Sequence, residues 1–197
     1  LLALWMGNRL GTVSQEEYRR AAAAFLELPG KMEEVLSRRD GIQYLASQYF
    51  NHDSIFFIGR NLDYALGLEG SLKLKEISYI HSEAYASGEL KHGTISLIED
   101  GTLVVALSTC DKLFDKAMSN VVEVKARGAS VLALTVESRK EEMSHIADAV
   151  MTIPDIHDLL LPTLGVIPLQ LFAYYVALMR GCDIDKPRNL AKSVTVE

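Results

Sequence analysis

Residues 54–93 read SIFFIGRNLDYALGLEGSLKLKEISYIHSEAYASGELKHG, and the predicted fold is built outward from this segment. It begins with the apolar run of residues 55–59, which predicts a strand buried on both faces. Residues 65–82 follow with a helical pattern, and residues 83–86 predict a second strand. A strand, a long helix and another strand in succession are typical of two parallel strands joined by a crossover helix.

The alternation of strands and helices continues after residue 93. We predict three further strands and two further helices, at residues 103–108, 130–136 and 149–153 and at residues 113–127 and 140–145. The strand segments LVVALS and VLALTV are apolar throughout, as expected for parallel strands covered by helices on both faces. The sequence therefore predicts an α/β fold, a doubly wound three-layer α/β/α arrangement with a parallel sheet of about five strands.

The carboxyl edge of the predicted sheet is where a ligand is expected. Doubly wound parallel sheets bind ligands outside the carboxyl ends of their strands. Here that edge carries residues 59–61, the loop of residues 86–93 and residues 108–109, so we expect the chemistry-bearing residues to gather there. Histidine is the side chain suited to proton transfer near neutral pH, so His92, in the loop, is a natural candidate for proton transfer to a substrate oxygen. The alternative is an exposed histidine without a role.

The first fifty residues predict a helical lead-in without evident chemistry. Helices are expected at about residues 15–28, 31–39 and 41–49, after an apolar helical segment at residues 1–10. Ser14 and Glu17 form a capping-box pattern, and Pro29-Gly30 ends the first of these helices. We expect the lead-in to pack on the domain that follows, and we interpret residues 1–10 as the end of a helix from a longer protein.

The composition describes an ordinary globular chain with no general attraction to polyanions. Of the 197 residues, 49% are hydrophobic and 23% are charged, and the net charge is −6. A negative net charge disfavours nucleic acid and anionic membrane surfaces as partners. Cys110 and Cys182 have neither metal-type spacing nor the pattern of a disulfide framework, which fits a reducing cytoplasmic compartment.

Residues 159–179 are long and apolar enough to cross a membrane. Their sequence, LLLPTLGVIPLQLFAYYVALM, has no formal charge but contains two prolines and several polar side chains. Such residues need partners inside a lipid-exposed helix. We therefore predict a helix buried in the core or in a subunit interface, and no membrane span.

Three charged side chains have unusual places on the helical wheel of residues 65–82. Glu69, Lys73 and Glu76 fall inside a broad arc that also holds most of the large apolar side chains, while glycines and serines occupy the opposite side. A buried charge is costly unless it is paired. An acid and an amine one turn apart, in partly apolar surroundings, are therefore a candidate acid/base pair. The alternative is a set of ordinary ion pairs on a helix surface.

Residues 183–197 are polar and show no clear helical or strand period. Their few apolar members could pack against a surface and leave Lys192 pointing inward. A tail that closes over a site excludes water and supplies a late catalytic group. The alternative is a frayed terminus.

Two segments carry a resemblance to a known family. GLEGSLKLKEISYIHSEAYASGELKHG at residues 67–93 and DKPRNLAKSVTVE at residues 185–197 resemble the glutamine–fructose-6-phosphate aminotransferase (isomerising) family, also called glucosamine-6-phosphate synthases. The likeness covers residues 14–197. Full chains of this family join an N-terminal glutaminase domain to two sugar isomerase (SIS) domains. The resemblance implies that residues 1–50 end the first SIS domain, residues 51–182 form the second, and residues 183–197 form an active-site tail.

The family converts fructose 6-phosphate and glutamine to glucosamine 6-phosphate and glutamate, the first step of amino-sugar synthesis toward UDP-N-acetylglucosamine. The resemblance implies that this chain is the isomerase fragment of such an enzyme, acts as a homodimer in the cytoplasm, and needs neither a cofactor nor a metal. The implied partners are the sugar phosphate, the glutaminase domain and the first SIS domain, with no nucleic acid and no membrane.

The resemblance also implies roles for individual residues of this chain. Glu76 is the base that moves a proton between C1 and C2 of the sugar, and Lys73 tunes Glu76 and assists the transfer. His92 is the acid/base of ring opening and reaches the site of the neighbouring subunit. Lys192 forms a Schiff base with the open-chain ketose. The residues that contact the substrate are Ala191, Lys192 and Glu76.

Two family features are missing from the sequence. It contains neither the phosphate-binding loop of S-Q-S-G-E-T type nor the N-terminal cysteine nucleophile of the glutaminase domain. We therefore expect the isolated chain to bind fructose 6-phosphate poorly and to have little or no synthase activity. The alternatives are a non-catalytic SIS module that binds a sugar phosphate and a dimerisation domain. A sensor would need the phosphate clamp rather than Glu76, Lys73 and Lys192 together, so we favour the enzyme fragment.

Overall fold

One parallel sheet organises the molecule. The computed structural model describes residues 1–190, and within them five strands pair in the order β2-β1-β3-β4-β5, all of them parallel. The strands are β1 (Ser54–Gly59), β2 (His81–Ala86), β3 (Leu103–Ser108), β4 (Ser130–Val136) and β5 (Ala149–Ile153). The predicted α/β fold is confirmed. The largest difference in a strand is at β2, which begins at His81 rather than at residue 83.

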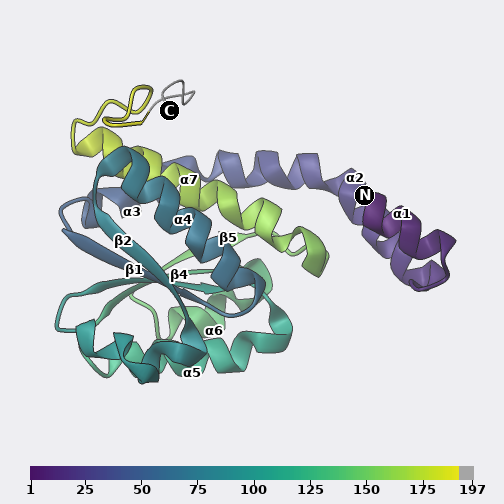
Figure 1. Cartoon of the computed structure of the whole chain (residues 1–197), viewed down its shortest axis with the longest axis horizontal. Coiled ribbons are helices and arrows are strands. Elements are labelled where there is room, and N and C mark those ends of the chain that lie inside the picture. Colours follow the sequence, from purple (N-terminus) through teal and green to yellow (C-terminus); the bar gives the residue numbers. More distant parts are fainter. Residues whose placement is uncertain (191–197) are drawn as a thin grey trace, which may run out of the picture.

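Helices cover both faces of the sheet and give three layers (Figure 1). One layer consists of α3 (Arg39–Tyr49), α4 (Leu62–Ser78) and α7 (Leu161–Met179), and the other of α5 (Phe114–Lys125) and α6 (Lys140–Ser144). Successive residues of β1 alternate between the layers, because Ile55 and Phe57 join the core under α4 and α7 while Phe56 and Ile58 join the core under α5. Since both faces are covered, the three central strands β1, β3 and β4 are almost entirely buried and mostly apolar, whereas the edge strand β2 is polar and only partly buried.

The helix α4 buries its small side chains and turns its charged side outward, so the prediction from the helical wheel is wrong. Gly67 and Gly70 are buried, whereas Leu68 and Leu72 are 48% and 41% exposed. A Cβ atom on Gly70 would lie only 2.8 Å from Leu169 Cδ1 of α7. At Gly70 the helix lies too close to α7 for a larger side chain, and glycine permits the approach.

The helix α4 also ends earlier than predicted, at Ser78 rather than at residue 82. Tyr79 follows in a left-handed conformation with φ 62° and ψ 14°, which ends the helix and redirects the chain. Ile80 is then buried, and β2 begins at His81. Tyr79 and Ile80 continue the helical spacing of apolar residues past this turn, so the pattern alone did not indicate it.

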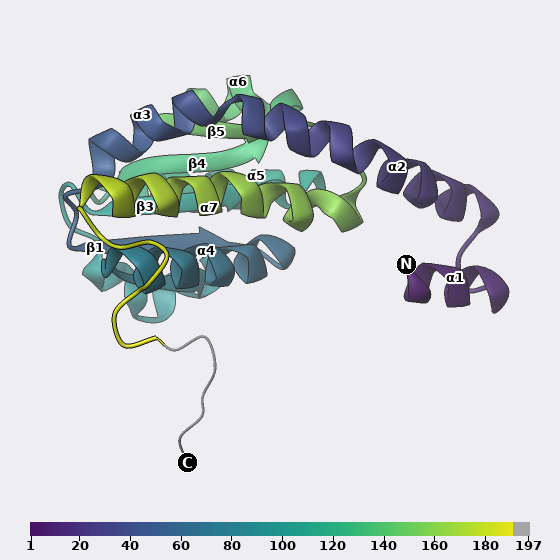
Figure 2. The same ribbon diagram turned by 90° about the horizontal axis from the view of Figure 1, so that it is seen from above.

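The helical lead-in contains one long helix where two were predicted. The short helix α1 (Leu2–Arg9) precedes α2 (Gln15–Ser37), which continues through Pro29. Ser14 caps α2 as predicted, because its hydroxyl oxygen accepts the N–H of Glu17 at 3.1 Å. Pro29 is exposed, so water can reach the backbone carbonyl that the proline leaves unpaired one turn earlier. Helix α1 and the first part of α2 extend away from the α/β body (Figure 2).

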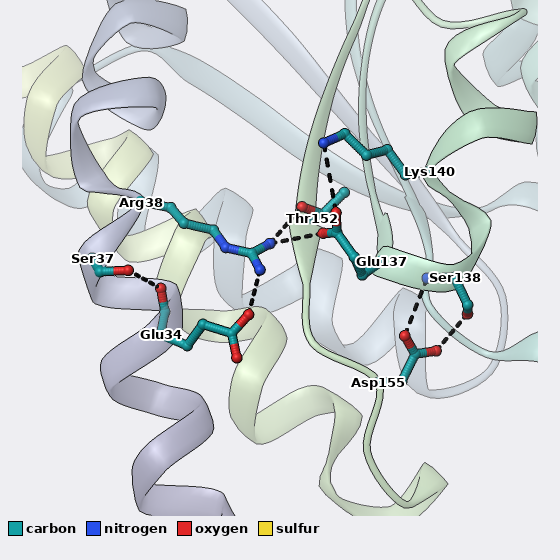
Figure 3. Close-up of polar contacts among 8 residues, drawn as sticks. All are labelled: Glu34, Ser37, Arg38, Glu137, Ser138, Lys140, Thr152 and Asp155. Atoms are coloured by element: carbon teal, nitrogen blue, oxygen red, sulfur yellow. Dashed lines mark hydrogen bonds and ion pairs between the residues drawn. The ribbon is translucent and has the colours of Figure 1, made fainter.

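A charged junction fastens the lead-in to the sheet (Figure 3). Arg38, between α2 and α3, donates from Nη1 to Glu137 Oε2 and to Thr152 Oγ1, both at 2.8 Å. Its Nη2 pairs with Glu34. The hydrogen bond from Thr152 and the pairing with Arg38 lower the pKa of Glu137. Because Glu137 follows β4 and Thr152 belongs to β5, these contacts tie the end of α2 to the β5 edge of the sheet.

The helix α7 is a core helix, as its apolar sequence predicts. The stretch Asp158–Met179 is long and apolar enough to cross a membrane, yet 56% of its most apolar window is buried inside the structure. Leu164, Phe172 and Val176 are buried where α7 packs against α3, α4 and the sheet. The helix fills the centre of one layer of the domain.

Candidate active site

The candidate catalytic residues lie toward opposite ends of the sheet. Helix α4 runs antiparallel to the strands, because it begins after β1 at the carboxyl edge and ends before β2 at the amino edge. Lys73 and Glu76 belong to its last turns. His92 ends the short 3-10 helix η1 (Ser87–His92), which follows β2 at the carboxyl edge. The prediction of a single edge is therefore wrong for the residues of α4, and one chain does not bring Glu76 and His92 together.

An ion-paired cluster occupies the outer face of α4. Lys73 Nζ lies 2.8 Å from Glu76 Oε2 and 3.7 Å from Glu69 Oε1. The side chains of Lys73 and Glu76 are 33% and 29% exposed. The hydrogen bond to Glu76 raises the pKa of Lys73, against the opposing effect of partial desolvation. Lys73 therefore stays protonated at neutral pH and donates a hydrogen bond to the Glu76 carboxylate.

His92 points into solvent from the end of η1. Its side chain is 76% exposed and faces Glu89, whose Oε2 lies 3.8 Å from the imidazole Nε2. Gly93 follows with φ 150°, a conformation that glycine adopts readily. Within residues 1–190, no ion pair or hydrogen bond joins His92 to another candidate residue. The imidazole therefore faces solvent rather than another candidate residue.

A second polar cluster holds the loop that carries His92. Arg60 donates from Nε and Nη2 to Asn120 Oδ1 at 3.0 and 2.8 Å. Lys91 pairs with Glu123 on α5 at 3.0 Å. A Cβ atom on Gly88 would lie 3.4 Å from Arg60 Nη1, so the loop backbone packs directly on the guanidinium group. Sequence reasoning missed this cluster, and the one signal for it was an asparagine in the middle of a helix.

At the carboxyl edge of the sheet, the buried carboxylate of Asp63 binds the loop that follows β3 and leaves little open space there. Asp63 is 3% exposed and accepts the Thr109 N–H at 2.9 Å, the Thr109 hydroxyl at 2.5 Å and the Cys110 N–H at 3.4 Å. Burial raises the pKa of Asp63, and these hydrogen bonds oppose the rise. The adjoining cavity, which Asn61 and Leu161 help to line, has a volume of about 30 Å³. A water molecule fits such a volume, but a sugar phosphate does not.

The described part of the C-terminal segment returns to the end of α4. The backbone N–H of Arg188 donates to Tyr79 Oη at 2.8 Å, and the guanidinium carbon of Arg188 lies 4.0 Å from the centre of the Tyr79 ring. A shallow recess of about 450 Å³ lies beside this contact. Ala191 and Lys192 lie outside the described residues. The segment thus approaches the end of α4 that carries Glu76, rather than the edge that carries His92.

Metal chemistry has no ready ligand set in the described part of the chain, where no group of three or more His, Cys, Asp or Glu side chains could hold an ion. Cys110 and Cys182 are free thiols. A cavity of about 590 Å³ lies between α2 and the segment after β5, where His157 Nε2 is 2.9 Å from Glu17 Oε1. The described candidate residues do not line this cavity, so its size does not bear on their chemistry.

The fold defines the class of protein. A parallel sheet between two helical layers makes the chain a doubly wound α/β domain. The SIS domain family matches residues 48–180, and the chain belongs to this family.

Individual proteins with known names show which members of the family this chain is similar to. Over 197 residues the chain is 53% identical to glutamine–fructose-6-phosphate aminotransferase (isomerizing) of Clostridium acetobutylicum, with 100% of this chain and 32% of the relative covered. The C-terminal domain of glucosamine-fructose-6-phosphate aminotransferase from Francisella tularensis superimposes with a TM-score of 0.89 at 33% identity, covering 94% of this chain and 52% of that chain. Glucosamine-6-phosphate deaminase from Thermotoga maritima gives a TM-score of 0.66 at 26% identity, covering 96% and 52%. The predicted resemblance is confirmed, and the chain spans about a third of the length of the curated relatives it matches.

Proposed function

We propose that this chain supplies the isomerase chemistry of a glutamine–fructose-6-phosphate aminotransferase, which forms glucosamine 6-phosphate and glutamate from fructose 6-phosphate and glutamine. The observation that carries the proposal is the contact of Lys73 Nζ with Glu76 Oε2 at 2.8 Å, in a chain 53% identical to an enzyme of that name. The reaction starts amino-sugar synthesis toward UDP-N-acetylglucosamine.

Glu76 is the proposed base of the ketose–aldose isomerisation. Its carboxylate takes a proton from C1 of the sugar and the proton is returned at C2. Lys73 remains a cation beside it, so the amine orients the carboxylate and offers positive charge to oxygen atoms that become negative during the transfer. General base catalysis of this kind contributes about 10²–10⁴-fold to a rate.

His92 is the proposed acid/base of ring opening, acting in the site of a second subunit. The imidazole is 76% exposed and lies toward the opposite end of the sheet from Glu76. A homodimer that pairs the His92 edge of one subunit with the Glu76 end of the other would complete both sites, as an isologous interface does. The exposure of His92 supports this arrangement, since a histidine that served its own chain would need to lie near Glu76.

Residues 183–197 are the proposed active-site tail, with Ala191 and Lys192 as substrate contacts alongside Glu76. The neutral Lys192 amine adds to the carbonyl carbon of the open-chain ketose, and the carbonyl oxygen leaves as water to give a Schiff base, in a site otherwise shielded from water. The contact of Arg188 with Tyr79 supports this proposal, because it directs the segment toward the end of α4.

The remainder of the complete enzyme is also proposed from the relatives. Residues 1–50 end the first SIS domain and residues 51–182 form the second. The first SIS domain contributes the phosphate clamp, and the glutaminase domain contributes ammonia. The closed loop at Asp63 supports an external clamp, since its cavity of about 30 Å³ cannot admit a sugar phosphate. The enzyme acts in the cytoplasm without a metal or other cofactor.

The test of the proposed base uses a complete enzyme that carries this chain as its C-terminal region. Glu76→Gln keeps the shape of the side chain but cannot accept a proton, and we expect formation of glucosamine 6-phosphate to fall about 100-fold or more. Glutamine hydrolysis should be preserved. The matched control is Glu69→Gln, because Glu69 Oε1 lies 3.7 Å from the same amine. A near-normal rate in the Glu76 variant would contradict the assignment.

A dimerisation module is the second candidate function, and one observation favours it. Leu62, Leu68 and Leu72 of α4 are 44%, 48% and 41% exposed on a helix that otherwise packs closely. Exposed leucines along one helix offer an apolar surface to another subunit. Replacing Leu68 and Leu72 with Lys and measuring the mass in solution by sedimentation tests this role, which predicts a shift from dimer to monomer.

A further inference from the structure

The conformation of Tyr79 is unusual for its residue type. Across the described residues 1–190, the residues other than glycine with positive φ are Asn61, Tyr79 and Asn189. Asparagine tolerates this region of backbone space, whereas a bulky aromatic residue there is an outlier. Glycine or asparagine is the usual residue where a helix ends in this way. Strained positions of this kind persist where surrounding contacts hold them, and they cluster at functional sites.

The contacts that hold Tyr79 come from the C-terminal segment. The Tyr79 hydroxyl oxygen accepts the backbone N–H of Arg188 at 2.8 Å. The guanidinium carbon of Arg188 lies 4.0 Å from the ring centre, well inside the range of a cation–π contact. One side chain therefore holds both the backbone and the side chain of a residue that is distant in sequence. A glycine or asparagine at this position could make neither contact.

A second contact fastens the same segment one residue earlier on α4. The Cys182 thiol lies 3.8 Å from the backbone carbonyl oxygen of Ser78. The segment after α7 is thus held at two points, at residues 182 and 188, and both points lie at the end of α4. Figure 2 shows this segment leaving α7 and passing the end of α4. Asp183 adds a local turn, since its side chain accepts the N–H groups of Asp185 and Lys186 at 3.1 and 3.0 Å.

We propose that Tyr79 is a positioning residue that sets the point from which the active-site tail extends. This inference rests on the proposed function, because it concerns the placement of Lys192 relative to Glu76. Tyr79 is three residues after Glu76, directly after α4 ends, and Lys192 is four residues after Arg188. Four residues span at most about 14 Å between Cα atoms, so a chain anchored at Arg188 has a limited reach from the end of α4.

The first experiment tests the contact itself and involves no catalysis. Tyr79→Phe removes the acceptor and keeps the ring, Tyr79→Leu removes both contacts, and Tyr79→Asn removes both while suiting the left-handed backbone. The readouts are hydrogen exchange of the Arg188 amide by NMR and trypsin cleavage after Arg188. The matched control is Tyr44→Phe, on an exposed tyrosine of α3.

We expect the Arg188 amide to exchange about fivefold faster in Tyr79→Phe, as the loss of one hydrogen bond predicts. Cleavage after Arg188 should be faster still in Tyr79→Leu and Tyr79→Asn. The melting temperature of Tyr79→Asn should equal or exceed that of the parent, because asparagine relieves the backbone strain. Unchanged exchange and cleavage at Arg188 in all three variants would overturn the inference.

The second experiment tests the functional consequence in the complete enzyme. Borohydride reduction in the presence of fructose 6-phosphate traps a Schiff base as a stable amine, because hydride reduces the C=N bond. We expect Tyr79→Asn to slow trapping about tenfold, with glutamine hydrolysis and melting temperature preserved, and Tyr79→Phe to lie between this variant and the parent. Trapping at the parental rate in Tyr79→Asn, once its Arg188 amide is shown to be released, would refute the positioning role.

Lys192→Ala separates failure of this inference from failure of the proposed function. If Lys192→Ala abolishes trapping while Tyr79→Asn leaves it unchanged, the Schiff-base assignment stands and the positioning role of Tyr79 is refuted. If trapping and isomerisation survive in Lys192→Ala, the proposed role of Lys192 is refuted. The functional part of the inference falls with it, and the contact measured by amide exchange is judged on its own result.

Discussion

The two faces of α4 differ in what they contribute to the protein. The inner face, with Gly67 and Gly70, lies close to the sheet and to α7 and belongs to the packed core. The outer face carries Lys73 and Glu76, which are paired with each other and remain about a third exposed. The comparison teaches that close approach of a helix to its neighbours is set by glycines at the contact points, alongside buried leucines such as Leu66 and Leu74, while its paired charges face outward.

The strongest test of this comparison asks whether the outer face of one subunit works with the His92 edge of another. In the complete enzyme, Glu76→Gln and His92→Asn should each lower glucosamine 6-phosphate formation about 100-fold or more. Mixed and re-associated chains should recover about one quarter of normal activity, because half of the dimers then hold one intact site. The measurement is product formation before and after mixing.

The control for this mixing experiment is the same pair of substitutions in one chain, which should recover nothing on mixing with itself. Absence of recovery in the mixed sample, with dimer exchange shown by mass spectrometry, would mean that His92 and Glu76 do not act across subunits.

The inner face should be sensitive to a single methyl group. Gly70→Ala places a Cβ atom 2.8 Å from Leu169 Cδ1, and we expect a loss of about 1–3 kcal/mol in the free energy of unfolding. Gly30→Ala is the matched control, since a Cβ atom there meets nothing within 4 Å. That change should stabilise α2 by about 0.5–1 kcal/mol. Urea denaturation of both variants shows whether the free energy of unfolding depends on the space available at each glycine or only on replacing glycine with alanine.

The beginning of α4 should show a pH dependence set by Asp63. We expect Asp63→Asn to lose about 1–3 kcal/mol of unfolding free energy, because an amide cannot accept all three hydrogen bonds. Burial raises the pKa of Asp63 in the folded state, so its protonation favours folding. That contribution is full below the ordinary pKa of an aspartate and is lost as the pH rises through the raised value.

The stability difference between the parent and Asp63→Asn should therefore shrink from acid to neutral pH. Urea denaturation followed by circular dichroism between about pH 4 and pH 7 measures this trend. A difference that grows with pH would show that the carboxylate is stabilised, rather than opposed, by its surroundings.

The smallest expected effect is the loss of stability when the ion pairs on the outer face of α4 are removed. Lys73→Met should change the free energy of unfolding by less than about 1 kcal/mol at neutral pH, because the pair is partly exposed. The raised pKa of Lys73 means that its contribution is present at neutral pH and is lost only as the pH rises through that alkaline pKa. Thermal unfolding at low and high salt measures this change in stability, with Lys75→Met as the control. A large loss would assign Lys73 to the core.

The fold could be predicted from the sequence because the strands carry their own signal. Parallel strands covered on both faces are mostly apolar, and three of the five strands show this directly. The errors have local physical causes. Pro29 was expected to end a helix, but it is exposed and is tolerated within α2. Tyr79 was placed within a helix because hydrophobic spacing carries no information about a left-handed turn.

The site was predictable only in part. Lys73 and Glu76 were found from their spacing, but their side of the helix was misjudged because hydropathy measures carbon content and not clearance. The bonds of Asp63 with Thr109 and of Arg60 with Asn120 join residues 46 and 60 positions apart, so no local pattern could identify the two partners. The roles of His92, Lys192 and Ala191 came from the family resemblance and stay predictions.

The central position of α7 has a consequence for how the protein is made. Its residues Leu161–Met179 cover α3, α4 and one face of the sheet, yet the ribosome adds them after every strand. A nascent chain that has reached residue 160 therefore holds every strand while the apolar surfaces that α7 covers are still exposed, and such species are prone to aggregate. We expect this protein to depend on chaperones during synthesis more than its stability after release would indicate.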